Sequence, residues 1–281
     1  MGRVFGGIET NSAAATHPRG SKDLKQLDEM VRAGLDRLYD FQHGDGGWGW
    51  WKEGESDHWM TAYVVWGLAL ARDAGVPVKE DVTHRAAKYL DEHLVEEEES
   101  PDMQAFMLHA LSAYYAPFKG KLGDVDFIRF VPKAEDNLWK RREALNAYTR
   151  ALFALAEHNF DHGDRAKTLI ENLENGVKRD DRPDTSVLTG PDPSHLTPDT
   201  SVQGTAHWGE DGIYWRWSDG GVEATAFALR ALLAIDPESK LIEPAMNWLV
   251  KGRRGAQWSN TRDTAIAILS LNEYLGKSGE L

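Results

Sequence analysis

Four acidic residues stand near the start of strongly apolar segments of this 281-residue sequence, where carboxylates could do chemistry. They are Asp45, Asp57, Glu223 and Asp263. Two facing carboxylates can cleave a glycosidic bond, one as an acid and the other as a base or nucleophile. Acidic side chains also cap the free N–H groups at a helix start and interact favourably with the helix dipole. The positions favour capping, and we expect no catalytic residue.

The sequence also gives no pattern for a metal site or a nucleophile. It contains no cysteine, which excludes thiolate ligands, a Cys nucleophile and disulfides. None of its ten histidines belongs to a His-Glu-x-x-His motif, and there is no Gly-x-Ser-x-Gly turn. The acidic run Asp180-Asp-Arg-Pro-Asp184 lies in a polar stretch and is interpreted as solvated charge. We therefore expect no bound metal and no cofactor.

Tryptophans gather in two glycine-containing stretches, Gln42 to Trp51 and His207 to Trp217. Glycines at such density end a helix and form turns. The rings could pack on helix ends, because a buried indole needs only one acceptor for its N–H group. They could instead form an exposed surface that binds a peptide or a glycan. The candidate residues for that surface are Trp48, Trp50, Trp51, Trp208, Trp215 and Trp217.

Two kinds of helix would position these residues. Five segments are apolar on nearly every face and predict buried helices: about 59–72, 102–115 and 143–157, and those following residues 223 and 262. They recur at intervals of about forty residues, except that the third interval is about twice as long, which is typical of a helical repeat. Amphipathic segments, about 22–42, 81–95, 126–139 and 163–175, alternate with them and predict outer helices. We expect Pro132 to break the third of these.

This alternation predicts an all-α fold, an α/α toroid of helical hairpins that forms a single domain over residues 1–281. Residues 176–221 carry four prolines and no helical pattern, so we expect a long loop insertion there. The net charge of −13 argues against nucleic acid and anionic membranes as partners. No apolar run is long enough to span a bilayer.

Two motifs carry a resemblance to known families. Trp215-Arg-Trp-Ser-Asp-Gly-Gly-Val-Glu-Ala-Thr-Ala, followed by Asn247-Trp-Leu and Trp258-Ser-Asn-Thr-Arg-Asp-Thr, resembles the thioester domain of the alpha-2-macroglobulin and complement family. The Trp48 turn with Trp59-Met-Thr-Ala-Tyr-Val is similar to the bacterial branch of that family, and the resemblance covers roughly residues 22–275. Gln42 to Trp48 also resembles the turn motif of squalene and terpene cyclases, which are toroids of helical hairpins.

The resemblance implies a domain that has lost its thioester. The family's reactive motif is Cys-x-Glu-Gln, whereas this N-terminus reads Phe5-Gly-Gly-Ile-Glu-Thr-Asn. Gly7 stands at the Cys position, Glu9 matches, and Thr10 stands at the Gln position. Residues 1–21 are therefore a degenerate N-terminal segment, the family's next inner helix is largely missing there, and the sixth hairpin of the ring is expected to be incomplete.

By resemblance, the domain serves a larger bacterial protein that traps proteases and acts in the periplasm, in the cell envelope or outside the cell. Its partners would be other domains of that parent chain and a target protease. Two alternatives stay open: a toroid enzyme, terpene-cyclase-like or glycan-active, and a peptide- or glycan-binding module. The enzyme would need an acidic constellation lining an apolar cavity, which the sequence does not indicate. The binding module would need the tryptophans exposed together.

Overall fold

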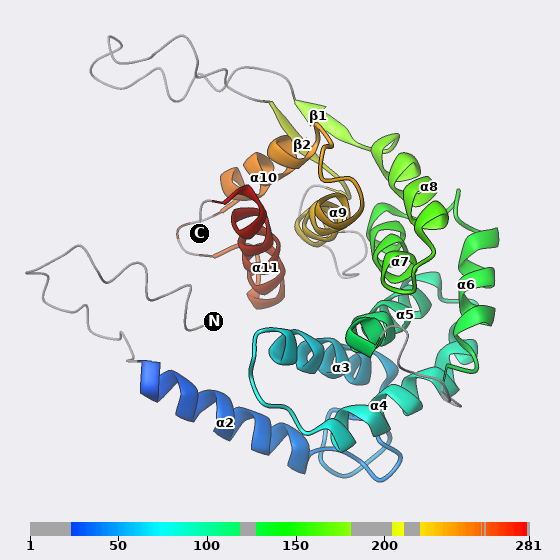
Figure 1. Cartoon of the computed structure of the whole chain (residues 1–281), viewed down its shortest axis with the longest axis vertical. Coiled ribbons are helices and arrows are strands. Elements are labelled where there is room, and N and C mark those ends of the chain that lie inside the picture. The colour runs from blue at the N-terminus through cyan, green and yellow to red at the C-terminus, as the bar shows by residue number, and fades with distance from the viewer. Residues whose placement is uncertain are drawn as a thin grey trace, which may run out of the picture.

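The computed structural model describes residues 24–118, 128–180, 204–210, 220–253, 255 and 257–279. Within these ranges the chain forms an arc of helical hairpins with an inner and an outer layer (Figure 1). The inner helices are α3 (His58–Asp73), α5 (Pro101–Tyr115), α7 (Ala147–Asn159), α9 (Gly221–Ile235) and α11 (Thr261–Ser278). The outer helices are α2 (Leu24–Asp40), α4 (Glu80–His93), α6 (Val131–Lys140), α8 (Gly163–Glu174) and α10 (Ile242–Lys251), and the short 3-10 helices are η1 (Leu94–Glu97) and η2 (Ala116–Phe118).

Burial separates the two layers as the sequence pattern predicted. In α9, the residues from Glu223 to Leu233 are all buried, because neighbours cover the helix on every side. In α8, only a stripe at three-to-four spacing is buried, Ala166, Leu169, Ile170 and Leu173. Aromatic rings from four inner helices meet at the centre, where the Phe227 ring lies 5.5 Å from both Trp66 and Tyr148. The all-α toroid prediction is confirmed.

The arc is less well covered at its two ends. No side chain from Lys25 to Asp40 of α2 is fully buried, and in the 18-residue α11 only Ile266, Ala267 and Ser270 are. In the described part of the chain, no further inner helix lies between α11 and α3 (Figure 1). The incomplete sixth hairpin was predicted for residues 1–21 and stays a prediction. Residues 1–21, predicted as the degenerate N-terminal segment, lie outside the described residues.

The prediction of a break at Pro132 is wrong. Helix α6 begins at Val131, so the proline falls in the first turn. Proline is tolerated there because its missing N–H group would have no partner within the helix and its φ angle already suits the helix. The apolar pattern from residue 126 extended the predicted helix beyond its true start. The described residues contain no helix long and apolar enough to cross a membrane.

The described part of the predicted insertion, residues 176–221, contains two short strands. Strand β1 (Lys178–Asp180) pairs antiparallel with β2 (Thr205–His207), with Arg179 opposite Ala206. Ala206 is buried, and the ring of His207 stacks on Trp248 of α10 at 4.6 Å. The two strands therefore bring residues 178–180 and 205–207 together, with β2 packed against α10. Residues 181–203 and 211–219 lie outside the described residues.

Candidate functional site

The tryptophan turns lie where an outer helix passes into the next inner helix. At three of these junctions a buried tryptophan donates its indole N–H to a carbonyl in the last turn of the preceding outer helix. Trp48 donates to Leu38 of α2, Trp208 to Leu173 of α8, and Trp258 to Leu249 of α10, each at 2.8 Å. The last carbonyls of a helix lack the usual partner one turn further along the helix. Leu38 and Leu173 also accept from the backbone N–H groups of Phe41 and Gly176, at 3.2 and 3.1 Å, so at these two junctions the indole adds a second hydrogen bond to the carbonyl.

The same three tryptophans also bind the inner helix that follows. The backbone N–H of Trp48 donates to the hydroxyl of Thr61 at 2.9 Å. Trp208 and Trp258 repeat this bond to Thr225 and Thr264, both at 3.0 Å. We call this double attachment the tryptophan latch. At these three junctions it joins the outer helix to the inner helix that follows through one residue. This gives the recurrence of the tryptophan turn in the sequence a structural reason.

The latch corrects the predicted binding surface. Trp48 and Trp208 are 2% and 0% exposed, so neither can contact a ligand. Trp50 and Trp51, by contrast, are 73% and 78% exposed. Trp215 and Trp217 lie outside the described residues, as do the thioester-equivalent positions Gly7, Glu9 and Thr10. The structure therefore leaves one exposed aromatic pair in the described part of the predicted surface.

The Gln-x-x-x-Gly-x-Trp pattern of the first turn is explained by packing. The side-chain amide of Gln42 donates to the carbonyls of Gly46 and of Val82 on α4, both at 2.8 Å. Gly46 has φ +96°, and a Cβ atom there would lie 2.6 Å from the carbonyl oxygen of Arg85. Only glycine fits so close an approach at a positive φ. The motif thus holds the turn against α4.

The four carboxylates singled out in the sequence have separate structural roles. Asp57 caps α3, as predicted, by accepting from the N–H of Met60 at 2.8 Å. Asp45 accepts from the N–H of Gly47 at 2.9 Å and the hydroxyl of Ser56 at 2.8 Å, inside the first turn. Asp45 thus binds only within the first turn and Asp57 only at the start of α3, so both residues stabilise local structure.

The two C-terminal carboxylates do not cap their helices, which corrects the capping interpretation. Glu223 forms a two-pronged ion pair with Arg262 of α11, whose guanidinium also lies 5.4 Å from the ring centre of Trp59. Asn260 caps α11, and Asp263 lies in its first turn and accepts from the Asn260 amide at 3.0 Å. Burial lowers the pKa of Arg262 and raises that of Asp263. Among the described residues these four carboxylates form no catalytic pair.

Sequence reasoning missed a buried acidic cluster between α6, α7 and α8. Nδ1 of His162 lies 3.1 Å from Glu135 and 3.0 Å from Glu157, and Arg165 lies 3.7 Å from Glu157. Burial and the charge of Glu157 raise the pKa of Glu135 to about 7. His158 and His162 have i, i+4 spacing, but α7 ends at Asn159, so they do not share a helix face.

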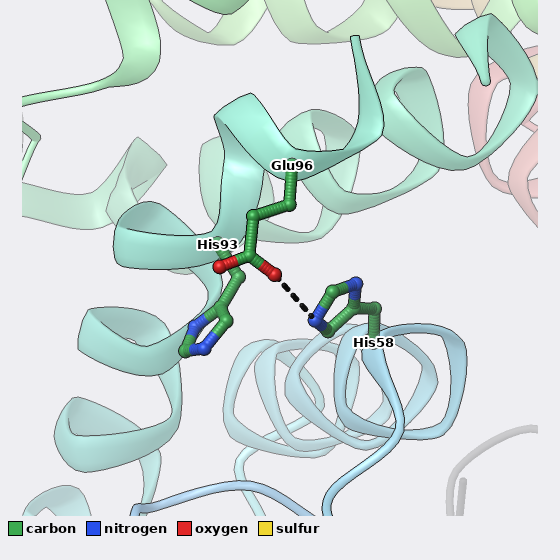
Figure 2. Close-up of side chains that lie close together, drawn as sticks. All are labelled: His58, His93 and Glu96. Carbon is green, nitrogen blue, oxygen red and sulfur yellow. Dashed lines mark ion pairs between the residues drawn. The ribbon is translucent and has the colours of Figure 1, made fainter. Parts of the chain in front are cut away.

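A second cluster combines His58, His93 and Glu96, with one potential metal-ligand atom from each residue within 4.8 Å of the others (Figure 2). The histidines lie 35 residues apart in the chain, at the N-terminal end of α3 and the C-terminal end of α4. No short motif could have revealed this pair. The cluster is a candidate metal site that the sequence did not predict.

The fold and the latches define a class, the α/α toroids built from helical hairpins. Within that class, residues 13–98 match the family model of the A-macroglobulin TED domain. An alpha-2-macroglobulin of Thermotoga maritima is 41% identical over 93 residues, 33% of this chain and 6% of that protein. An alpha-2-macroglobulin of Escherichia coli is 33% identical over 94 residues, 32% of this chain and 6% of that protein.

The fold comparison extends over most of the chain. The crystal structure of native E. coli alpha-2-macroglobulin, from domain MG7 to the C-terminus, matches 90% of this chain and 35% of its own, with a TM-score of 0.56 and 17% identity. Residues 13–98 are therefore similar to the TED domain of bacterial alpha-2-macroglobulins, and most of the chain shares a fold with the E. coli protein. The chain spans only a small part of the curated relatives that it matches.

Proposed function

We propose that this domain is the thioester-domain equivalent of a bacterial alpha-2-macroglobulin-like protease trap, and that it works without a thioester. The observation that carries the second part is the absence of cysteine from all 281 residues. A thioester needs a thiol, and Gly7 stands where the resemblance places it. In place of acylating its target, the domain acts through packing and displacement, when cleavage elsewhere in the parent triggers collapse around the protease.

The surface of the described residues supports a partner within a longer parent chain. Met30 of α2 and Ile268 of α11 are about half exposed at the two ends of the arc, and Trp50 and Trp51 are exposed on the first turn. Adjacent exposed apolar side chains such as Trp50 and Trp51 are typical of interaction sites, whereas single ones are common on any protein surface. We propose that other domains of the parent cover these residues, and that the parent acts in the periplasm, in the cell envelope or outside the cell.

The chemical part of the proposal is tested by intact-mass measurement. The domain is incubated with methylamine, which opens thioesters, and then with a protease and a labelled amine. We expect no mass increase in either case. A stable adduct would show that another activated acyl group exists and would overturn the proposal of a domain without covalent chemistry.

The trapping part is tested on the parent protein from its natural source. A protease is added, and its activity is measured on a large protein substrate and on a small peptide substrate. Enclosure predicts that cleavage of the large substrate falls while cleavage of the peptide persists. The complex should dissociate in denaturant, because no covalent bond forms. Equal loss on both substrates, or no loss on either, would contradict trapping.

The exposed Trp50 and Trp51 favour one narrower alternative, a peptide- or glycan-binding surface on the isolated domain. Tryptophan fluorescence during titration with peptide and glycan libraries would detect it, and the double substitution of both residues by Ser should abolish the signal. Binding by the isolated domain that this variant loses would favour the binding module over contact with another domain of the parent.

A further inference from the structure

We propose that His58, His93 and Glu96 form a Zn²⁺ site that clamps the N-terminal end of α3 to the C-terminal end of α4. The residues come from three separate elements, α3, α4 and η1 (Figure 2). The carboxylate of Glu96 lies between the two imidazole rings, whose centres are 5.2 Å apart. Two histidines and one glutamate are a ligand set that Zn²⁺ uses in proteins, with water in the fourth position.

Hydrogen bonds fix the protonation of both rings. Nδ1 of His58 lies 2.8 Å from a carboxylate oxygen of Glu97, and Nδ1 of His93 lies 2.7 Å from the carbonyl oxygen of Tyr89. Both of these oxygens can only accept, so each Nδ1 must carry a proton. In the neutral rings, Nε2 then holds the lone pair. Both histidines are therefore held in the tautomer that binds a metal through Nε2.

These two acceptors are the supporting groups that zinc-binding histidines use. A metal-bound imidazole almost always donates its other N–H to a carboxylate or a backbone carbonyl, which sets the ring orientation and raises its basicity. Glu97 has this role for His58, and Tyr89 has it for His93. The Tyr89 ring also stacks on the His93 ring with centres 4.1 Å apart, which restricts rotation of the imidazole.

The separation between His58 and Glu96 suits a bridging metal ion better than a direct hydrogen bond. Nε2 of His58 and the carboxylate oxygen of Glu96 are 3.6 Å apart, beyond hydrogen-bond range. In a tetrahedral site with bonds of about 2.0 Å, neighbouring ligand atoms are roughly 3.3 Å apart. Glu96 is more than half exposed, so a small rotation of its side chain closes the remaining gap.

The local charge favours a cation at this place. Four consecutive glutamates, residues 96–99, follow the end of α4, whose C-terminus carries the negative end of the helix dipole. Glu98 and Glu99 pair with Lys133 and Arg141. Glu96 and Glu97 face His58. Imidazole nitrogens select Zn²⁺ over Mg²⁺ and Ca²⁺, which prefer oxygen ligands.

Isothermal titration with ZnCl₂ tests the proposal on the tag-free chain, in a buffer without chelators. We expect one Zn²⁺ per chain. His58→Gln and His93→Gln should each weaken binding by at least about tenfold, since even a supporting residue changes affinity 10- to 100-fold. His84→Gln is the matched control, an exposed histidine on α4 about 13 Å along the helix from His93. Its affinity should stay within about twofold of the unsubstituted chain.

Thermal melts with and without Zn²⁺ test the same site when a substitution also destabilises the fold, because each variant is compared with itself. Added Zn²⁺ should raise the melting temperature of the unsubstituted chain and of His84→Gln, and should leave that of His58→Gln unchanged. Glu97→Ala should weaken binding, and Glu97→Gln, which keeps an acceptor for Nδ1, should restore much of it. The proposal is overturned if Zn²⁺ does not bind saturably, or if all variants bind it equally. It is also overturned if only His162→Gln abolishes binding, because Zn²⁺ would then bind at the cluster of Glu135, Glu157 and His162.

Discussion

Removing the indole N–H of Trp208 tests the tryptophan latch directly. Trp208→Phe keeps an aromatic ring in a fully buried position but deletes the donor to Leu173, itself fully buried. The carbonyl keeps its bond from the backbone N–H of Gly176 at 3.1 Å, so the lost indole bond costs about 0.5–1.5 kcal/mol. The missing ring atoms leave roughly 40 Å³, which at about 24 cal/mol per Å³ adds about 1 kcal/mol. We expect a loss of about 1.5–2.5 kcal/mol in the free energy of unfolding.

Thermal unfolding followed by circular dichroism measures this effect. For a chain of this size, such a loss lowers the melting temperature by roughly 3–10 °C. Trp50→Phe makes the same chemical change on a residue that is 73% exposed, and its effect should stay within about 0.5 kcal/mol. If both variants melt within about 1 °C of the unsubstituted chain, the indole bond to α8 does not stabilise the fold and the latch has no energetic role.

Three further predictions concern the acidic cluster, the first turn and the β1–β2 segment. Burial raises the pKa of Glu135 from 4.5 to about 7, so the folded state binds more protons than the unfolded state and loses stability as pH rises between these values. Glu135→Gln should therefore raise the free energy of unfolding by up to about 3 kcal/mol at pH 8, and with it the melting temperature. At pH 4 the substitution should have no such effect. A gain of equal size at both pH values would contradict a charge effect. Gly46→Ala should cost more than about 1 kcal/mol in urea unfolding because of its positive φ and the close Arg85 carbonyl, whereas Gly34→Ala, in open space on α2, should not be destabilising. Replacing residues 182–203 by a short Gly-Ser linker should change the melting temperature little. A deletion that also removes β1 should lower it clearly, because the pairing with β2 is lost. If both variants lower the melting temperature equally, the replaced stretch packs on the fold.

Local sequence patterns predicted much of the fold. Alternation of all-round apolar and amphipathic segments identified the inner and outer helices, because a helix's hydrophobic pattern reflects how many sides its neighbours cover. Asp57 before an apolar run correctly predicted a cap, since capping depends only on residues three positions apart. The resemblance at the Trp48 and Trp215 motifs predicted the TED-like fold. The prediction at Pro132 was wrong because a proline in a first turn and a proline that breaks a helix look alike before the helix start is known.

The tertiary structure alone decided which polar and aromatic residues meet. Trp48 and Trp50 lie two positions apart in one glycine-rich turn, yet one is buried and the other exposed, because Trp48 packs against the end of α2 and donates to the Leu38 carbonyl. His58 and His93, or Glu135 and Glu157, become neighbours only when separate helices pack side by side. The sequence determined that the chain lacks a thiol and forms helical hairpins, since both follow from composition and short-range periodicity. The clusters that could bind a metal or hold a proton depend on contacts between helices whose residues lie more than 20 positions apart in the chain. Short-range periodicity does not encode such contacts.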